Sequence, residues 1–297
     1  MRPLEGVLVV DLTRYLPGPF ASRELLQLGA RVVRLEPPGG DPLLDTARAW
    51  HEALNAGKES VTCDLKTEPE RGRAVCAEAD VVIEGFRPGV AARLGIGPRD
   101  LPDSIVYCSI TGFGLGNRHE QRAAHDLNYL GWAGVLADTV PGLPPIQIAD
   151  LAAGSLTAVN RILAALLERQ RTGRGVYIVV SMTHSSHRFV AHRLGGEPIP
   201  RLLTGGLACY GVYETSDRRY LTVAALEQKF FARLCELLGL AELVARQYDA
   251  EAQTDIADTL AERFGARPLA AWLELFDGED VCVGPVATRE EAAAELG

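Results

Sequence analysis

Short apolar runs alternate with segments of helical periodicity through the first two thirds of the chain. Runs rich in branched apolar residues are typical of buried strands, and we expect five, at residues 6–12, 31–36, 80–84, 105–110 and 176–180. Helical patterns occupy residues 19–28, 68–79 and 150–169. Strands joined through helices favour a parallel sheet with helices on its faces. The pattern therefore predicts a large, Rossmann-like α/β domain over residues 1–195.

The pattern changes after residues 195–201, a Gly- and Pro-rich stretch with the composition of a linker. Beyond it, residues 210–213 and 220–224 carry the aromatic and branched residues of a β-hairpin that turns across Ser216-Asp217. Two amphipathic helices are expected at residues 229–238 and 254–264. Residues 200–297 are therefore expected to form a smaller α+β domain.

Length and charge narrow the class of protein. At about 150 residues per domain, 297 residues fit two domains. The 30 basic and 39 acidic residues leave a net charge of −9 with no basic stretch, which argues against a nucleic-acid partner. We expect no signal peptide and no membrane span. The six cysteines form no C-x-x-C motif and are expected to be reduced, so the predicted compartment is the cytoplasm.

Basic residues recur near the ends of the predicted strands in the first domain. Ligands of open α/β sheets bind at the carboxyl ends of the strands, where arginine and lysine can hold phosphate groups. A dinucleotide is disfavoured, because the first turn has two prolines, Pro17 and Pro19, in place of G-x-G-x-x-G. The cations are therefore either a site for another phosphorylated ligand or solvated surface charges. They are Arg34, Lys58, Lys66, Arg87 and Arg93.

Two further residues are candidates for acid–base chemistry. His125 follows a Gly-rich loop at residues 111–116, and histidine is the side chain whose ordinary pKa lies nearest neutrality. Asp150 stands at the start of the long helical pattern. A carboxylate there is either a helix N-cap or a base or nucleophile. From the residues alone, a structural role in the loop is the more usual one for such a histidine.

Sequence stretches distributed over nearly the whole chain carry a resemblance to a known family. Two of them read Phe86-Arg87-Pro88-Gly89-Val90 and His125-Asp126-Leu127-Asn128-Tyr129. With these, the chain resembles the family III CoA-transferases and, within that group, the α-methylacyl-CoA racemases. The other matching stretches are residues 4–7, 10–14, 16–21, 28–37, 57–58, 64–66, 94–95, 109–114 and 172–175, with weaker matches at 205–206, 226–227 and 282–286.

The resemblance implies a CoA-thioester substrate and a homodimer. It implies no metal, flavin or nicotinamide, and no cofactor beyond the CoA moiety of the substrate. The residues that correspond to the family's contacts with CoA and its thioester are Arg34, Lys58, Asp64, Lys66, Gly85, Phe86, Arg87, Arg93, Gly112, Phe113, Gly114, Asp126 and Tyr129.

The resemblance also assigns catalytic roles. Racemases of the family use a histidine and an aspartate as paired acid–base catalysts, which match His125 and Asp150, and Glu227 matches a carboxylate that supports the histidine. The transferases use an aspartate at the position of Asp150 as nucleophile and lack the histidine. His125 therefore favours an acyl-CoA racemase. A CoA-transferase and an inactive CoA-ester-binding homologue are the alternatives.

The chain departs from the family pattern in three places. It stops soon after residue 286, where relatives continue into a segment that returns to the large domain, so interlocking of two subunits is in doubt. The loop after Gly114 lacks the usual Gly-Pro. Residues 181–187 replace a stretch that usually starts with an acidic residue. His184 and His187 in that stretch are expected to be helical, and we assign them no role.

Overall fold

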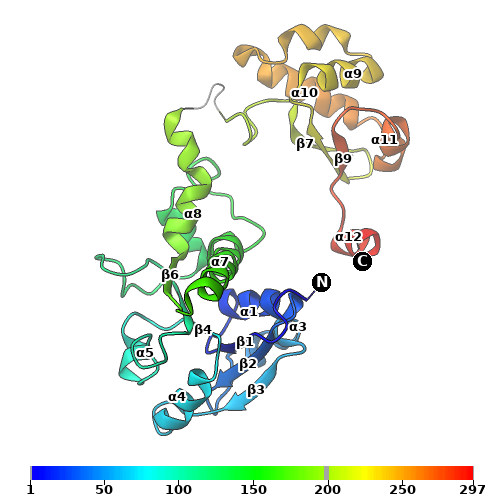
Figure 1. Ribbon diagram of the computed structural model, residues 1–297. Helices are drawn as coiled ribbons and strands as arrows, with labels where there is room; N and C mark the ends of the chain where they lie inside the picture. Colours follow the sequence, from blue (N-terminus) through cyan, green and yellow to red (C-terminus); the bar gives the residue numbers. More distant parts are fainter. Residues whose placement is uncertain (1, 197–200, 297) are drawn as a thin grey trace. The chain divides into compact units, whose positions relative to one another are not determined.

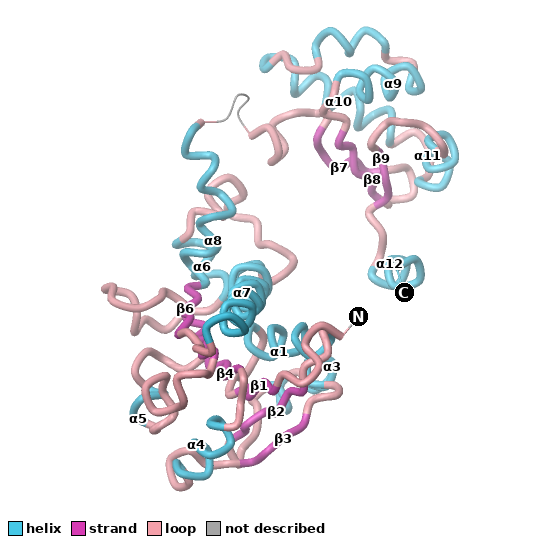
Figure 2. The backbone as a smooth tube through the Cα atoms, in the orientation of Figure 1, coloured by secondary structure: helices cyan, strands magenta, loops and turns pink. Residues whose placement is uncertain are grey.

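The structure is a computed structural model that describes residues 2–196 and 201–296. Part of the expected linker, residues 197–200, therefore lies outside the described residues. The chain divides into two compact units, Met1–Leu194 and Gly195–Gly297. Figure 1 labels many of the helices and strands of each unit, and Figure 2 distinguishes helix, strand and loop by colour.

Six parallel strands form the sheet of the first unit, in the order β3-β2-β1-β4-β5-β6. Every neighbouring pair is parallel, which confirms the predicted α/β class with a parallel sheet. The strands are β1 (Leu8–Asp11), β2 (Arg31–Glu36), β3 (Glu59–Thr62), β4 (Val81–Glu84), β5 (Val106–Thr111) and β6 (Tyr177–Ser181). The α-helices are α1 (Pro17–Gln27), α2 (Leu43–Thr46), α3 (Arg48–Asn55), α4 (Pro69–Ala77), α5 (Val90–Arg93), α6 (Asp126–Trp132), α7 (Thr157–Thr172) and α8 (Met182–Val190).

Strand β3 was not among the five expected strands. It pairs with β2 at the edge of the sheet. Three of its four residues are exposed, and only Val61 is half-buried. A largely solvated edge strand has no apolar run by which it could be predicted from the sequence. Its position in the sheet depends on hydrogen bonding to β2.

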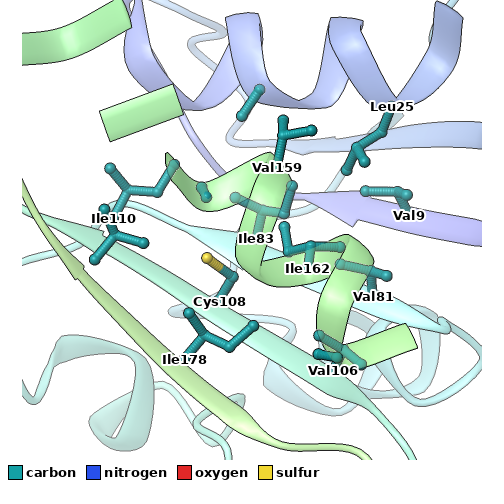
Figure 3. Packing of buried hydrophobic residues seen from close by; sticks show 14 of the residues in the cluster. Val9, Leu25, Val81, Ile83, Val106, Cys108, Ile110, Val159, Ile162 and Ile178 are labelled. Atoms are coloured by element: carbon teal, nitrogen blue, oxygen red, sulfur yellow. The ribbon is translucent and has the colours of Figure 1, made fainter. Parts of the chain in front are cut away.

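The first unit buries apolar residues on both faces of the sheet. Figure 3 shows Val9, Val81 and Val106 packed with Leu25 of α1 and Ile162 of α7. The next residues along three of the strands face the opposite way and belong to a second cluster with α4 and α5; they are Val10, Val82 and Tyr107. Each fully buried Val or Ile side chain contributes about 1.5–3 kcal/mol, so both helix layers are held by apolar burial.

The long predicted helix is two helices in sequence. A π-helix, η1 (Ala149–Leu156), leads directly into α7, and a short 3₁₀ helix, η2 (Ala191–Gly195), follows α8. The continuous stretch Ala149–Thr172 is long and apolar enough to cross a membrane by length and composition. Its buried side chains, among them Ile162, pack on the sheet, as the core helix of an α/β unit does.

The second unit is a three-stranded antiparallel sheet with helices. Strands β7 (Tyr210–Glu214) and β8 (Tyr220–Ala224) confirm the predicted hairpin, and β9 (Val283–Pro285) pairs with β8 from the end of the chain. The helices are α9 (Gln228–Leu238), η3 (Ala241–Arg246), η4 (Ala250–Ala252), α10 (Gln253–Phe264), α11 (Leu269–Phe276) and α12 (Arg289–Leu296).

Aromatic side chains form the core of the second unit. Trp272 of α11 is 2% exposed, stacks on Phe276 at 5.9 Å between ring centroids, and meets Phe264 of α10 edge-on at 5.4 Å. The indole Nε1–H of Trp272 donates to the Phe264 carbonyl at 2.8 Å, so its polar atom is satisfied. Helix α11 had not been predicted. The six cysteines of the chain are free thiols, as expected, and only Cys282 is exposed.

Candidate active site

A cavity of about 670 Å³ lies in the first unit, beyond the carboxyl ends of β1, β4 and β5. These strands are neighbours in the sheet, and the chain order reverses between β1 and β4. Such a reversal leaves a crevice that binds ligands in open α/β sheets. The cavity is lined by residues 12–15, 17–18, 85–88, 110–113, 120, 122–125, 128–129, 150 and 182.

Asp150, in the first turn of η1, places a half-buried carboxyl in the wall of this cavity. Burial raises its pKa to about 7, and the negative charge of Asp126 adds to the rise. The Oδ1 atom of Asp126 in turn accepts a hydrogen bond from the Asp150 backbone N–H at 2.9 Å. A carboxyl with a pKa near 7 exists in both protonation states at neutral pH. Asp150 can therefore take or deliver a proton.

We expect the Asp126→Asn variant to lower the pKa of Asp150 from about 7 toward the ordinary aspartate range. The substitution removes a neighbouring negative charge and keeps an oxygen that can accept the Asp150 N–H. The pKa would be read from carbon-13 chemical shifts of labelled aspartate carboxyls against pH. An Asp150 pKa that stays at about 7 or rises would show that Asp126 does not tune it.

His125 lines the same cavity from the N-cap position of α6. Its backbone N–H donates to Oδ1 of Asn128 at 3.0 Å, which fixes the entry into the helix. The residue is exposed, so its imidazole is open to solvent and to a ligand in the cavity. The structure therefore brings His125 and Asp150, which are 25 positions apart in the sequence, into the lining of one cavity.

The Gly-rich loop after β5 forms the adjoining wall. A Cβ on Gly112 would lie 2.5 Å from a ring atom of Tyr129, so only glycine fits beside that ring. The Tyr129 hydroxyl donates to the Ala124 carbonyl at 2.8 Å, and its ring meets Phe113 edge-on at 5.4 Å. Gly112, Phe113 and Tyr129 all line the cavity, whereas Gly114 is buried below it with φ +80°.

Arg87 is the predicted cation that reaches this cavity. It is exposed and lines the wall beside Gly85 and Phe86, in the loop that follows β4. Arg34 instead lines a second pocket of about 380 Å³. Its guanidinium is buried, 2.9 Å from Oε1 of Glu36 and 3.0 Å from Nε2 of His51. Arg34 is therefore paired with Glu36 and His51, while its buried Nε and Nη2 atoms make no hydrogen bond within the described residues.

Lys58 is enclosed in the protein and reaches neither pocket wall. Its side chain is 0% exposed, and its Nζ donates to the Pro19 carbonyl at 2.7 Å, to Ser22 Oγ at 2.8 Å and to Asn55 Oδ1 at 2.9 Å. Oδ2 of the buried Asp11 lies 3.9 Å away. Burial lowers the pKa of Lys58 to about 8. Its three donors already have acceptors, so this arrangement leaves none for a phosphate.

The Lys58→Met variant should lower the free energy of unfolding by about 3–5 kcal/mol, because it leaves the buried Asp11 carboxylate without its cation. Urea denaturation followed by circular dichroism would measure the change. Lys66→Met is the matched control, since Lys66 is exposed, and surface substitutions usually stay within about 0.5 kcal/mol. Equal stability of the two variants would contradict the structural role of Lys58.

The other predicted residues lie outside both pocket walls in the described part of the chain. Asp64 accepts the Lys66 backbone N–H at 3.0 Å in the loop after β3, and Arg93 ends α5. Asp126 contacts a lining residue, because its Oδ1 accepts the hydrogen bond from the Asp150 backbone N–H. Glu227 belongs to the second unit, where it is the exposed N-cap residue of α9.

Several lining residues were not singled out from the sequence. Thr13, Arg14 and Tyr15 follow β1, and Arg122 and Asn128 flank His125. The first group could have been found from the rule that parallel strands end at one edge of the sheet. Pro17 and Pro19 in the turn after β1 argue against a dinucleotide. Pro17 nevertheless lines the cavity.

Comparison with known proteins places these observations in a family. The sequence model of CoA-transferase family III matches residues 4–296. The chain is 36% identical to α-methylacyl-CoA racemase from Homo sapiens, over 97% of this chain and 78% of that protein. It is 32% identical to succinyl-CoA:glutarate CoA-transferase from Mus musculus, over 99% of this chain and 74% of that protein.

Solved structures agree with this similarity. Rv3272 from Mycobacterium tuberculosis superposes with a TM-score of 0.85 at 27% identity, over 99% of this chain and 85% of that one. A CAIB/BAIF family protein from Brucella suis superposes with a TM-score of 0.84 at 30% identity, over 98% and 86% of the two chains. The fold and the sequence therefore indicate the same set of relatives.

Proposed function

The chain belongs to CoA-transferase family III, and we propose that it is an acyl-CoA racemase, which inverts the α-carbon of a 2-methylacyl-CoA-type thioester. The similar proteins include both a racemase and CoA-transferases. The observation that carries the proposal is that His125 and Asp150 line one cavity. Inversion needs two groups of this kind, one on each side of the carbon.

In the proposed reaction, neutral His125 takes the α-proton of one epimer, and the C–H electron pair moves into the enolate. The protonated Asp150 then delivers a proton to the opposite face, which leaves a histidinium and an aspartate. The other epimer follows the reverse course. A pKa of about 7 for Asp150 supports this assignment, because both protonation states of that carboxyl are populated at neutral pH. The reaction uses no cofactor beyond the CoA moiety.

The enolate oxygen requires hydrogen-bond donors, because positioned acids and bases alone contribute about 10²–10⁴-fold. Arg87 is assigned to the phosphates of CoA, because its guanidinium is the predicted cation in the cavity wall.

A CoA-transferase is the second candidate. In that reaction the Asp150 carboxylate attacks the thioester carbon, expels the CoA thiolate and forms a mixed anhydride, and an acceptor acid then completes the transfer. The 32% identity to a succinyl-CoA:glutarate CoA-transferase favours it. The transferase reaction gives His125 no role in proton removal, which is why we place the racemase first.

Proton NMR in D₂O tests the proposal with a 2-methylacyl-CoA and no acceptor acid. An enzyme-dependent loss of the α-proton signal, with inversion at that carbon, is the expected result. If no exchange occurs and a new thioester forms when a free carboxylic acid is added, the chain is a transferase. If CoA-ester binding is the only activity, the racemase proposal is wrong and the chain is a binding homologue.

A further inference from the structure

Glu84 is a buried carboxylate that the proposed reaction does not use. It ends β4, and the residue is 5% exposed. Among the described residues, 2–196 and 201–296, no ion pair involves it. An unpaired carboxylate in the interior is costly unless hydrogen bonds offset its lost hydration. Both of its oxygens do have such partners.

One oxygen of Glu84 holds the cavity wall. Oε2 accepts the backbone N–H of Phe86 at 2.6 Å. That bond spans Gly85, at the point where the chain leaves β4. Residues 85–88, including Phe86 and Arg87, line the cavity. The carboxylate therefore determines the direction in which this loop departs from the sheet.

The other oxygen is held by the neighbouring strands. Ser109 of β5 is paired with Glu84 in the sheet register, and its hydroxyl donates to Oε1. The Tyr177 hydroxyl of β6 lies 3.2 Å from the same serine oxygen. Three adjacent strands thus contribute one side chain each to a chain of hydrogen bonds that ends at the Phe86 amide. Because the sheet is rigid, this network can hold the loop more firmly than a contact within the loop.

We propose that Glu84 is a positioning residue for CoA-ester binding: it fixes the 85–88 loop through the Phe86 amide so that Arg87 faces the ligand. The proposal rests on the proposed function for the identity of the ligand. It assigns Glu84 no proton transfer. Glu84 acts through Arg87, so its removal should weaken binding and leave the chemical step nearly unchanged.

The test compares two substitutions by calorimetric titration with CoA and by kinetics with a 2-methylacyl-CoA. Glu84→Leu removes the acceptor for Phe86, and we expect the Kd for CoA and the KM to rise about tenfold with little change in kcat. Glu84→Gln keeps an oxygen that can accept the Phe86 N–H, so it should restore most of the affinity. Failure of Glu84→Gln to bind better than Glu84→Leu would overturn the proposal.

A double-substitution cycle separates positioning from a general loss of stability. If Glu84 acts through Arg87, the Kd of Glu84→Leu/Arg87→Ala should match that of Arg87→Ala alone. Independent, multiplicative effects would overturn the proposal. Tyr107→Phe is the matched control, because it deletes another buried hydrogen bond of β5, from the Tyr107 hydroxyl to the Ile96 carbonyl at 3.0 Å, which is not part of the chain of bonds from Tyr177 to Phe86. Its Kd should equal that of the wild type.

The two proposals fail in different ways. Wild-type protein that binds CoA and shows the Glu84 pattern, but exchanges no α-proton, would overturn the racemase and support the positioning role. Wild-type protein that racemises its substrate, with a Glu84→Leu variant of unchanged Kd and KM, would overturn the positioning role alone.

Discussion

The Asp150→Asn variant is expected to lose inversion of the α-carbon by about 10³-fold or more in kcat/KM. Asparagine matches the shape of aspartate and can neither take nor deliver the proton. Asp150 occupies the cavity wall with a pKa of about 7, so the loss removes one of the two proton carriers. Affinity for CoA should stay close to the wild-type value, because the phosphates are assigned to Arg87.

Deuterium exchange makes this prediction sharper. In the Asp150→Asn variant, His125 can still remove the α-proton of one epimer, namely the epimer whose α-proton points toward the imidazole. That epimer should exchange its α-proton in D₂O without inversion, and the opposite epimer should not exchange at all. The measurement is proton NMR on each separate epimer. Asp103→Asn is the control, since that side chain is 90% exposed and lies outside the cavity wall. Equal exchange from both epimers would contradict the two-base assignment.

The second large effect is expected for His125→Ala. Inversion should fall by about 10²–10⁴-fold, and exchange should persist only for the epimer that faces Asp150, the reciprocal of the first pattern. The helix start should survive, because the hydrogen bond to Asn128 uses the backbone N–H of residue 125. Polarimetry or chiral chromatography of the hydrolysed product would follow inversion.

His184→Ala is the matched control for this variant. His184 lies on α8, with its Nδ1 2.8 Å from Ser181 Oγ, and does not line the cavity among the described residues. Activity of that variant should equal the wild-type value. If His125→Ala transfers CoA to an acceptor acid at the wild-type rate while Asp150→Asn does not, the transferase is the correct assignment.

The elements with strong local signals were predictable from the sequence. Five of the six parallel strands are buried apolar runs, and the hairpin at residues 210–224 shows strand periodicity around a turn. Helix α8 contains His184 and His187, as expected. Edge strand β3 and strand β9 depend on partners distant in the sequence, so their own residues carry little signal.

The apolar runs and helical patterns were enough to predict the α/β class of the first unit, and the matching stretches were enough to predict the family. The sequence also indicated His125 and Asp150 as acid–base candidates and Arg87 as one of five cations near strand ends, and the resemblance to the family then assigned their roles. These properties are local, and neighbouring residues in the chain carry them.

Which polar residues line the cavity depends on the folded arrangement. Arg34 and Lys58 have the same positive charge as Arg87, but Arg34 is buried beside Glu36 and lines a different pocket, and Lys58 is enclosed among acceptors from α1 and α3. The pKa of Asp150 depends on burial and on Asp126, 24 residues earlier. Burial and charge proximity are properties of the folded arrangement, since they depend on residues that meet only after the sheet has formed.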